Sequence, residues 1–320
     1  MSSTAATTVT EQPANEMHTT LNGQPANVVH TTLNYFLDPK LGGHVDITPG
    51  TAGFYRRKYD THPVDIHDIR GREADFNLDK QGFQIYKHSS AEKDFQDDDQ
   101  IKAVYYPETE EWLKKVTGAT RVKVCTHLVR KDNREVLDAT IGSSGLADTD
   151  TIPKVVPARF VHVDHSRKGA IGFLYEEFEP EEAARLSKTR WSIINTWRPL
   201  KTVRKDPLAM CDSRSVRDDE LIPMTVHLPP KGSTTYENVS KGSFETLSTR
   251  MNPDHKWHYA SELKPDEALV IKIYDSKSER DKQLAGRVLH TSFEDPNTLN
   301  EESRESIETR CFVFYEDEAE

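Results

Sequence analysis

The stretch Ala158-Arg-Phe-Val-His-Val-Asp-His165 carries the residues on which the fold prediction depends. His162 and Asp164 stand two positions apart at the end of an apolar run, so on a strand both side chains leave the same face. A third donor must come from another strand, and His290, in the late apolar stretch Val288-Leu-His290, is a suitable candidate. Two imidazoles and one carboxylate form the facial triad of non-haem Fe(II) sites, which leaves other positions open. The pattern therefore predicts an iron site shared by two strands.

The tripeptide His-x-Asp is weak evidence when it stands alone. The chain repeats it as His44-Val-Asp46 in a glycine-rich loop, where a surface role is the simpler interpretation. The copy at His162 differs because an apolar run precedes it and a histidine and an arginine follow it downstream. The same donors also suit Mn(II) or Zn(II), so exchangeable open positions and a cosubstrate arginine are what would favour iron.

Two arginines in the stretch Arg304-Glu-Ser-Ile-Glu-Thr-Arg310 compete for the carboxylate of a 2-oxoacid cosubstrate. A planar guanidinium matches a carboxylate with two parallel hydrogen bonds. The two arginines share parity along the predicted strand, so alternation cannot choose between them. Arg304 is favoured because it begins the last strand, whereas for Arg310 we expect a salt bridge with Glu308 or Glu316.

Composition and charge exclude several classes of protein. The 320 residues carry 42 basic and 53 acidic side chains, a net charge of −11, without a Lys/Arg block that could follow a phosphate backbone, so we expect no nucleic-acid partner. No apolar run is long enough for a membrane helix, and no secretory signal is recognisable. Cys125, Cys211 and Cys311 form no C-x-x-C pair, which argues against a thiolate zinc site and for a reducing, cytoplasmic location. A homodimer is compatible with these features, and the oligomeric state stays open.

The chain predicts a short tail followed by one domain. Residues 12–22 are nearly repeated at 24–34, too few copies for a solenoid, so we expect residues 1–28 to be disordered and residues 29–320 to form a single domain. Helices are predicted from Pro107 to Lys115 and from Pro180 to Lys188, where proline and acids come first. Strands are predicted at 82–87, 122–129, 152–163, 191–197, 208–211, 223–228, 257–259, 268–274 and 307–315. Many short strands with few helices indicate a mainly β fold, a cupin-like double-sheet jelly roll with flanking α-helices.

Four blocks resemble a family of fungal enzymes. The blocks at 195–209 (Asn-Thr-Trp-Arg-Pro-Leu-Lys-Thr-Val-Arg-Lys-Asp-Pro-Leu-Ala), 264–275, 290–293 and 304–308 are similar to the gibberellin desaturase and aspergillic-acid hydroxylase/desaturase family. The resemblance spans residues 80 to 315 approximately and implies a double-stranded β-helix that uses Fe(II), 2-oxoglutarate and O2. It implies His162, Asp164 and His290 as metal ligands and Arg304 on the cosubstrate. The implied reaction is hydroxylation, desaturation or cyclisation of a small secondary-metabolite intermediate.

Further side chains are predicted to line the pocket. Asn195 and Trp197 share one strand face and are expected near the cosubstrate, while Arg198 either approaches the site or pairs with Asp212 to brace the sheet. The remaining candidates for substrate contact are His127, Arg130 and His165. Two alternatives stay open: a cupin-like metal-binding module without turnover, and an iron oxygenase that needs no 2-oxoglutarate.

Overall fold

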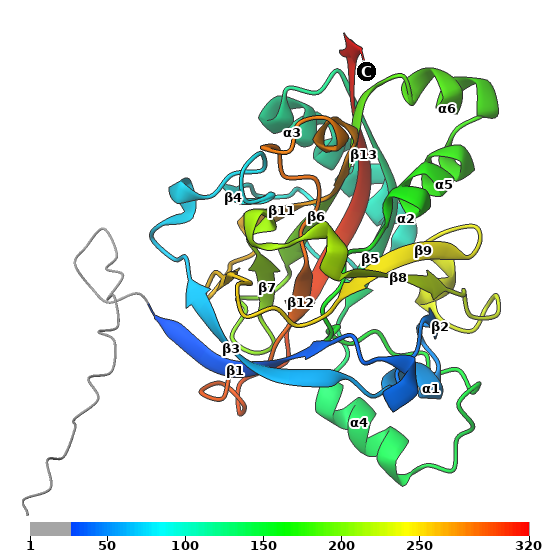
Figure 1. Ribbon diagram of the computed structural model, residues 1–320, viewed down its shortest axis with the longest axis vertical. Coiled ribbons are helices and arrows are strands. Elements are labelled where there is room, and N and C mark those ends of the chain that lie inside the picture. Colours follow the sequence, from blue (N-terminus) through cyan, green and yellow to red (C-terminus); the bar gives the residue numbers. More distant parts are fainter. Residues whose placement is uncertain (1–26, 320) are drawn as a thin grey trace, which may run out of the picture.

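Two five-stranded sheets and a three-stranded sheet form the frame of the molecule (Figure 1). The structure is a computed structural model that describes residues 27–319, so most of the predicted tail lies outside the described residues. The first sheet has the order β1 (Val28–Tyr35), β3 (Asp60–Asp68), β10 (Trp257–Tyr259), β7 (Leu208–Cys211) and β12 (His290–Ser292). The second has the order β4 (Phe83–Lys87), β11 (Glu267–Asp275), β6 (Thr189–Pro199), β13 (Ser306–Ala319) and β5 (Arg121–Arg130). The small sheet joins β2 (Asp46–Ile47), β8 (Leu221–Val226) and β9 (Phe244–Thr249). The mainly β jelly roll is confirmed.

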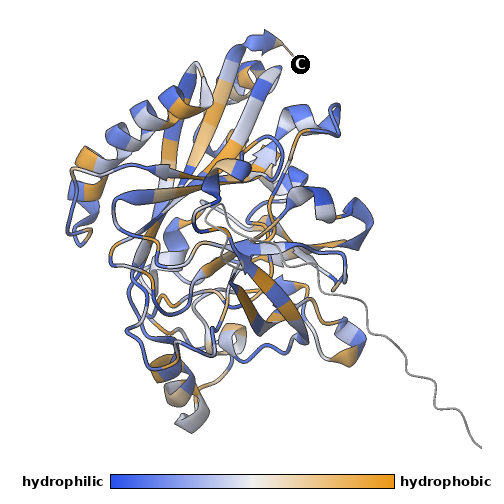
Figure 2. Ribbon diagram, turned by 90° about the vertical axis from the view of Figure 1, so that its left-hand side faces the viewer, coloured by the Kyte–Doolittle hydropathy of each residue, from blue (hydrophilic) through white to orange (hydrophobic). Residues whose placement is uncertain are grey.

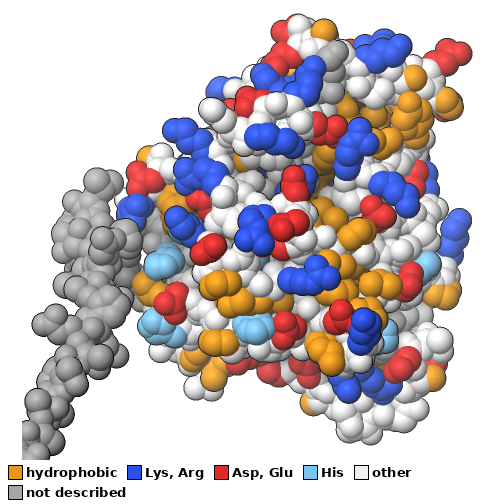
Figure 3. Space-filling model, viewed as in Figure 1, with side chains coloured by type: hydrophobic (Ala, Val, Ile, Leu, Met, Phe, Trp, Pro, Cys, Tyr) orange, Lys and Arg blue, Asp and Glu red, His pale blue; other side chains and the backbone are white. Residues whose placement is uncertain are grey.

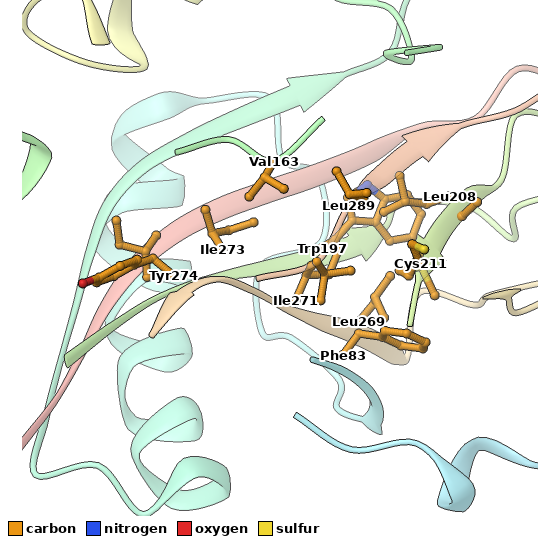
Figure 4. Packing of buried hydrophobic residues seen from close by; sticks show 14 of the residues in the cluster. Phe83, Val163, Trp197, Leu208, Cys211, Leu269, Ile271, Ile273, Tyr274 and Leu289 are labelled. Carbon is orange, nitrogen blue, oxygen red and sulfur yellow. The ribbon is translucent and has the colours of Figure 1, made fainter. Parts of the chain in front are cut away.

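The second sheet is buried on both faces, which makes it the centre of the core. Along β11, Leu269, Ile271 and Ile273 pack with Trp197 in the main core (Figure 4), as the alternation predicts. Val270 faces the other way, where a second cluster packs under a helix. Lys272 shares that outer face and is almost fully buried, with its Nζ 2.9 Å from an oxygen of Asp275.

Helices flank the sheets and are short (Figure 1). The predicted helix at Pro107 is α3 (Tyr106–Thr117), which ends at Gly118 in the left-handed conformation that glycine favours. The second predicted helix is α6 (Pro180–Leu186). The sequence patterns missed α4 (Arg134–Ser143) and α5 (Arg167–Glu177), although Asn133 and Ser166 cap their first turns in the usual way. The shortest are α1 (Ala52–Tyr55) and α2 (Asp98–Gln100), and a π-helix (Ile101–Tyr105) leads into α3.

The predicted strand at 152–163 is wrong for most of its length. Pro153 and Pro157 lack the N–H group that a ladder needs, and this segment is irregular up to its last residues. His162 and Val163 then form single bridges, to His290 and to Leu247. These two bridges join the segment to β12 of the first sheet and to β9 of the small sheet, so the irregular chain links the two.

Polar and apolar residues interleave along most elements, as expected when one face of each is buried (Figure 2). The segment that carries His162 also contacts β1, because the N–H of Val161 donates to the carbonyl of Asn34 at 2.9 Å. On the face shown in Figure 3, acidic and basic side chains are interspersed. Among the described residues, no helix is long and apolar enough to cross a membrane.

Candidate active site

Three side chains from two chain segments converge as the sequence predicts. One ligand atom from each of His162, Asp164 and His290 lies within 4.8 Å of the other two. The Oδ1 atom of Asp164 is 3.4 Å from Nε2 of His162 and 3.8 Å from Nε2 of His290. The bridge between the two histidines brings them together, because the backbone N–H of each donates to the carbonyl of the other, at 3.2 and 2.9 Å. A backbone pairing therefore sets the spacing of the triad.

The two imidazoles are oriented through their other nitrogen. Nδ1 of His162 lies 2.9 Å from the carbonyl oxygen of Phe160, and Nδ1 of His290 lies 3.0 Å from that of Val288. A proton on each Nδ1 donates to its carbonyl and leaves the Nε2 lone pair free for a metal. Burial and the neighbouring His162 lower the pKa of His290 to about 4, so that imidazole is neutral at physiological pH, as a ligand must be.

The second oxygen of Asp164 is held away from the histidines. Nδ2 of Asn195 donates to Oδ2 at 2.6 Å, and a guanidinium nitrogen of Arg310 lies 3.0 Å from the same oxygen. Burial opposes the charge on Asp164, but Arg310 and the two histidines hold its pKa well below the usual value. Oδ1 is thus the oxygen presented to a metal.

The predicted salt bridge of Arg310 with Glu308 or Glu316 is wrong. Arg310 shares the inward face of β13 with the even-numbered residues before it, and this direction brings it to Asp164 rather than to Glu308 or Glu316. Glu316 instead pairs with Arg185, at 2.5 Å, outside the core. The donor set around Asp164 is therefore more complete than the sequence indicates.

Arg304 is buried in a second polar position next to β12. One of its nitrogens donates to the carbonyl of Asp206 at 2.7 Å, and its guanidinium lies 5.2 Å from the ring centre of Trp197. Its Nε has no partner, and neither has the buried Oγ of Ser306 two residues later. Burial lowers the pKa of Arg304 to about 9, which still leaves it charged. Arg304, just before β13, and Ser306, its first residue, thus offer unpaired donors that fit a carboxylate group, so these residues suit a 2-oxoacid. Sequence reasoning missed Ser306, although its parity with Arg304 was visible.

A cavity opens beside His162 and Asp164, and its walls are largely apolar. The segment before β3, in which the sequence predicts no helix or strand, supplies three side chains to the wall. The lining residues that carry apolar or aromatic side chains are Ile47, Pro49, Phe54, Leu128, Ala158, Phe160, Val226, Tyr236, Val239 and Phe244. The polar ones besides the triad members are Thr126, His127, Arg130, Thr246, Glu308 and Arg310.

Of the other residues predicted to contact substrate, two line the cavity and His165 does not. His127 and Arg130 line the cavity, but both ring nitrogens of His127 already contact protein groups, the hydroxyl of Tyr106 at 2.9 Å and Asp98 at 3.3 Å. His165 is buried with its ring stacked on Phe173, 5.1 Å between centres, so it packs outside the set of lining residues.

Arg198 and Trp197 point to opposite faces of β6. Arg198 donates to the carbonyls of His88 and Pro265, at 2.5 and 2.8 Å, on the face away from Asp164. The prediction that it contacts substrate is therefore wrong, and it braces the sheet without Asp212, which pairs with Arg214 at 2.6 Å. Trp197 faces inward, where it contacts Arg304 rather than the cavity.

Comparison with known proteins agrees with this geometry. A family model described as an oxidoreductase/YMDC permease-like domain matches residues 33–314. Hydroxylase/desaturase CTB9 of Cercospora beticola is 45% identical over 286 residues, which cover 89% of this chain and 86% of that protein. The gibberellin cluster GA4 desaturase of Gibberella fujikuroi is 32% identical over 305 residues, covering 79% of this chain and 86% of the relative. The chain belongs to this family of hydroxylase/desaturases.

Comparison with solved structures shows that the similarity covers the whole fold of the chain. A variant of the iron and alpha-ketoglutarate-dependent endoperoxidase NvfI superposes with a TM-score of 0.69 and 25% identity, covering 90% of this chain and 97% of that one. Other relatives are named alpha-ketoglutarate-dependent dioxygenases, among them one from Talaromyces stipitatus at 33% identity over 84% of this chain. The protein is a non-haem Fe(II)- and 2-oxoglutarate-dependent oxygenase that uses O2, and the expected family is confirmed. These findings favour the oxygenase over a metal-binding module without turnover.

Proposed function

We propose that this oxygenase hydroxylates, desaturates or cyclises a small secondary-metabolite intermediate by removing hydrogen from an unactivated carbon. The observation that carries the proposal is the open side of the triad, which faces a cavity with mostly apolar walls. A hydrocarbon skeleton fits such walls, and few polar groups remain to orient it. The names of relatives, which are hydroxylase/desaturases, support the same class of reaction.

In this proposal, His162 and His290 bind the iron through Nε2 and Asp164 binds it through Oδ1. When bound, the iron with 2-oxoglutarate and O2 supplies the oxidising power, and the cosubstrate leaves as succinate and CO2. The chain's part is to hold the donor geometry: the carbonyls of Phe160 and Val288 orient the imidazoles, and Asn195 keeps Oδ2 away from the metal face. The aromatic wall excludes water from the reacting carbon.

Arg304 is proposed to bind the far carboxylate of 2-oxoglutarate, together with the hydroxyl of Ser306. Two observations support this assignment. Nε of Arg304 and Oγ of Ser306 are unpaired, and Arg304 has no acidic ion-pair partner among residues 27–319. Arg310 also has two unpaired nitrogens, Nε and Nη1, but it is the weaker candidate because its Nη2 lies 3.0 Å from Asp164, a ligand of the proposed metal site. Asn195 acts in this scheme through Asp164 rather than on the cosubstrate.

The test is an anaerobic titration of the metal-free protein with Fe(II) and then 2-oxoglutarate, following the visible charge-transfer band of the chelate. We expect a band in the wild type, none in His162→Ala, and in Arg304→Leu a band that needs at least about a hundredfold more 2-oxoglutarate, because two charge-assisted hydrogen bonds are lost. Absence of the band in the folded wild type contradicts the proposed site. Equal 2-oxoglutarate requirements in wild type and Arg304→Leu would exclude Arg304 from it.

We also propose a single catalytic domain over residues 29–320 in a cytoplasmic protein. Support for one domain comes from the first sheet, which joins β1 near one end of this range to β12 near the other. Support for the compartment comes from the three cysteines, all of which are free.

A further inference from the structure

Glu308 presents a carboxylate to the cavity without a partner from the protein. It lies on the inward face of β13, between Ser306 and Arg310, and lines the same cavity as His162 and Asp164. Within the described residues 27–319, no side-chain or backbone donor forms a hydrogen bond or ion pair with its carboxylate. The side chain is only partly exposed, so the donors for its carboxylate must come from solvent or from a ligand in the cavity.

Neither of the two nearby guanidinium groups pairs with Glu308, and each has another acceptor. The guanidinium of Arg130 donates to the carbonyl of Val156 at 2.9 Å and to the hydroxyl of Tyr236 at 3.3 Å. Nη2 of Arg310 is 3.0 Å from Asp164, while its Nε and Nη1 have no partner and do not reach Glu308. Burial and the charge of Asp164 raise the pKa of the Glu308 carboxyl, and the charges of Arg130 and Arg310 oppose this shift. The acceptor that remains free is therefore the carboxylate itself.

The charges around the cavity limit what can meet Glu308. An ammonium group would lie near the guanidinium groups of Arg130 and Arg310, and an anionic group would lie near Glu308 and Asp164. Phe54, Phe160 and other apolar groups build most of the same cavity wall. A neutral molecule with a mostly apolar skeleton and an O–H donor satisfies both the wall and the carboxylate.

We propose that Glu308 is a specificity-determining residue that accepts a hydrogen bond from a hydroxyl group of a neutral, largely apolar substrate. The inference rests on the proposed function, since it assigns the cavity beside the triad to the substrate. In the absence of substrate, water would hydrogen-bond to the carboxylate, and a substrate hydroxyl would replace it with an equivalent bond. An ether or hydrocarbon analogue removes the water without replacing the bond and therefore binds more weakly.

The test compares 2-naphthol with 2-methoxynaphthalene, which differ in the O–H donor. Their dissociation constants are measured by anaerobic calorimetry on the protein loaded with Fe(II) and 2-oxoglutarate, for the wild type, Glu308→Leu and Glu308→Gln. Glu316→Gln is the matched control, because Glu316 lies on the same strand but pairs with Arg185 outside the cavity. We expect the wild type and the control to prefer 2-naphthol by roughly tenfold or more, as a hydrogen bond to a charged acceptor implies.

In Glu308→Leu the preference is expected to vanish, and in Glu308→Gln to fall several-fold. If Glu308→Leu does not fold, Glu308→Gln decides alone. The proposal is overturned if the wild type binds neither probe or binds both equally, or if a folded Glu308 variant keeps the wild-type ratio. The charge-transfer band separates the two failures: a normal band without O–H preference rejects the role of Glu308, whereas a missing band rejects the proposed site.

Discussion

Replacing Arg310 with methionine should weaken iron binding more than it weakens 2-oxoglutarate binding. The guanidinium of Arg310 is 3.0 Å from Oδ2 of Asp164, and both side chains are about 10% exposed. Outer partners of metal ligands are worth about 10- to 100-fold in metal affinity, or roughly 1.4 to 2.7 kcal/mol. Removing one partner of a buried ion pair also costs about 3–5 kcal/mol of folding free energy. For both quantities, the loss of metal affinity and the loss of folding free energy, we expect the lower end of the range, because Asn195 still donates to the same oxygen at 2.6 Å.

The assay is a pair of measurements on the metal-free protein: an anaerobic Fe(II) titration and urea unfolding at pH 7.5. Arg185→Met is the matched control, because Arg185 pairs with Glu316 while 54% of its side chain is exposed, so its loss should change stability by no more than about 1 kcal/mol. The reasoning fails if Arg310→Met binds Fe(II) like the wild type and instead needs far more 2-oxoglutarate. That result would make Arg310 the cosubstrate arginine and its pairing with Asp164 incidental.

Four further outcomes are expected. Asn195→Ala removes a hydrogen bond to a charged acceptor and should raise the Fe(II) dissociation constant about tenfold, with calorimetry as the measurement. Arg304→Lys keeps the charge but not the planar fork, so the 2-oxoglutarate KM should rise less than in Arg304→Leu. Burial and His67 lower the pKa of His258 to about 4, so the unfolded chain takes up a proton below its ordinary pKa near 6.5 while the folded chain does not. Stability is therefore lost as pH falls from about 6.5 to 4, by about 2 kcal/mol at pH 5 for this group, and His258→Phe should flatten that part of the urea-unfolding profile. Leu269→Ala empties a fully buried position and should cost about 2–5 kcal/mol in the same experiment.

Local patterns predicted much of the fold. The helix at Tyr106 carries its start and stop signals within a dozen residues, and the strands around Trp197 and Ile271 show apolar runs that need no knowledge of their neighbours. Unlike the missed helices α4 and α5, the strands that were missed depend on distant partners. β1 and β3 carry His, Thr and Asp at many positions and exist as a paired ribbon, each supplying the other's backbone hydrogen bonds.

In the site, too, local patterns predict the direction of side chains but not their partners. Parity along β13 indicated that Arg304 and Arg310 face one side, but their partners come from elsewhere in the chain, and Asp164 rather than a glutamate of the same strand takes Arg310. Parity along β6 likewise separated Trp197 from Arg198, whose direction toward His88 only the packing reveals. The sequence predicts Glu308 only as a salt-bridge partner of Arg310, because nothing in its neighbours along the chain indicates a cavity.

The sequence by itself determined which donors are available: two imidazoles and a carboxylate without thiolate, and two arginines in phase on the last strand. These are properties of side-chain chemistry and of the two-residue period of a strand, which act over a few positions. The tertiary structure decided which atoms face the metal, because the bridge between His162 and His290 and the donation of Asn195 to Asp164 join segments that are far apart in the chain. It also decided the open side of the triad, since the cavity wall is assembled from segments as distant as Phe54 and Phe244. Contacts of that kind are set by the packing of the whole chain, and no short stretch encodes them.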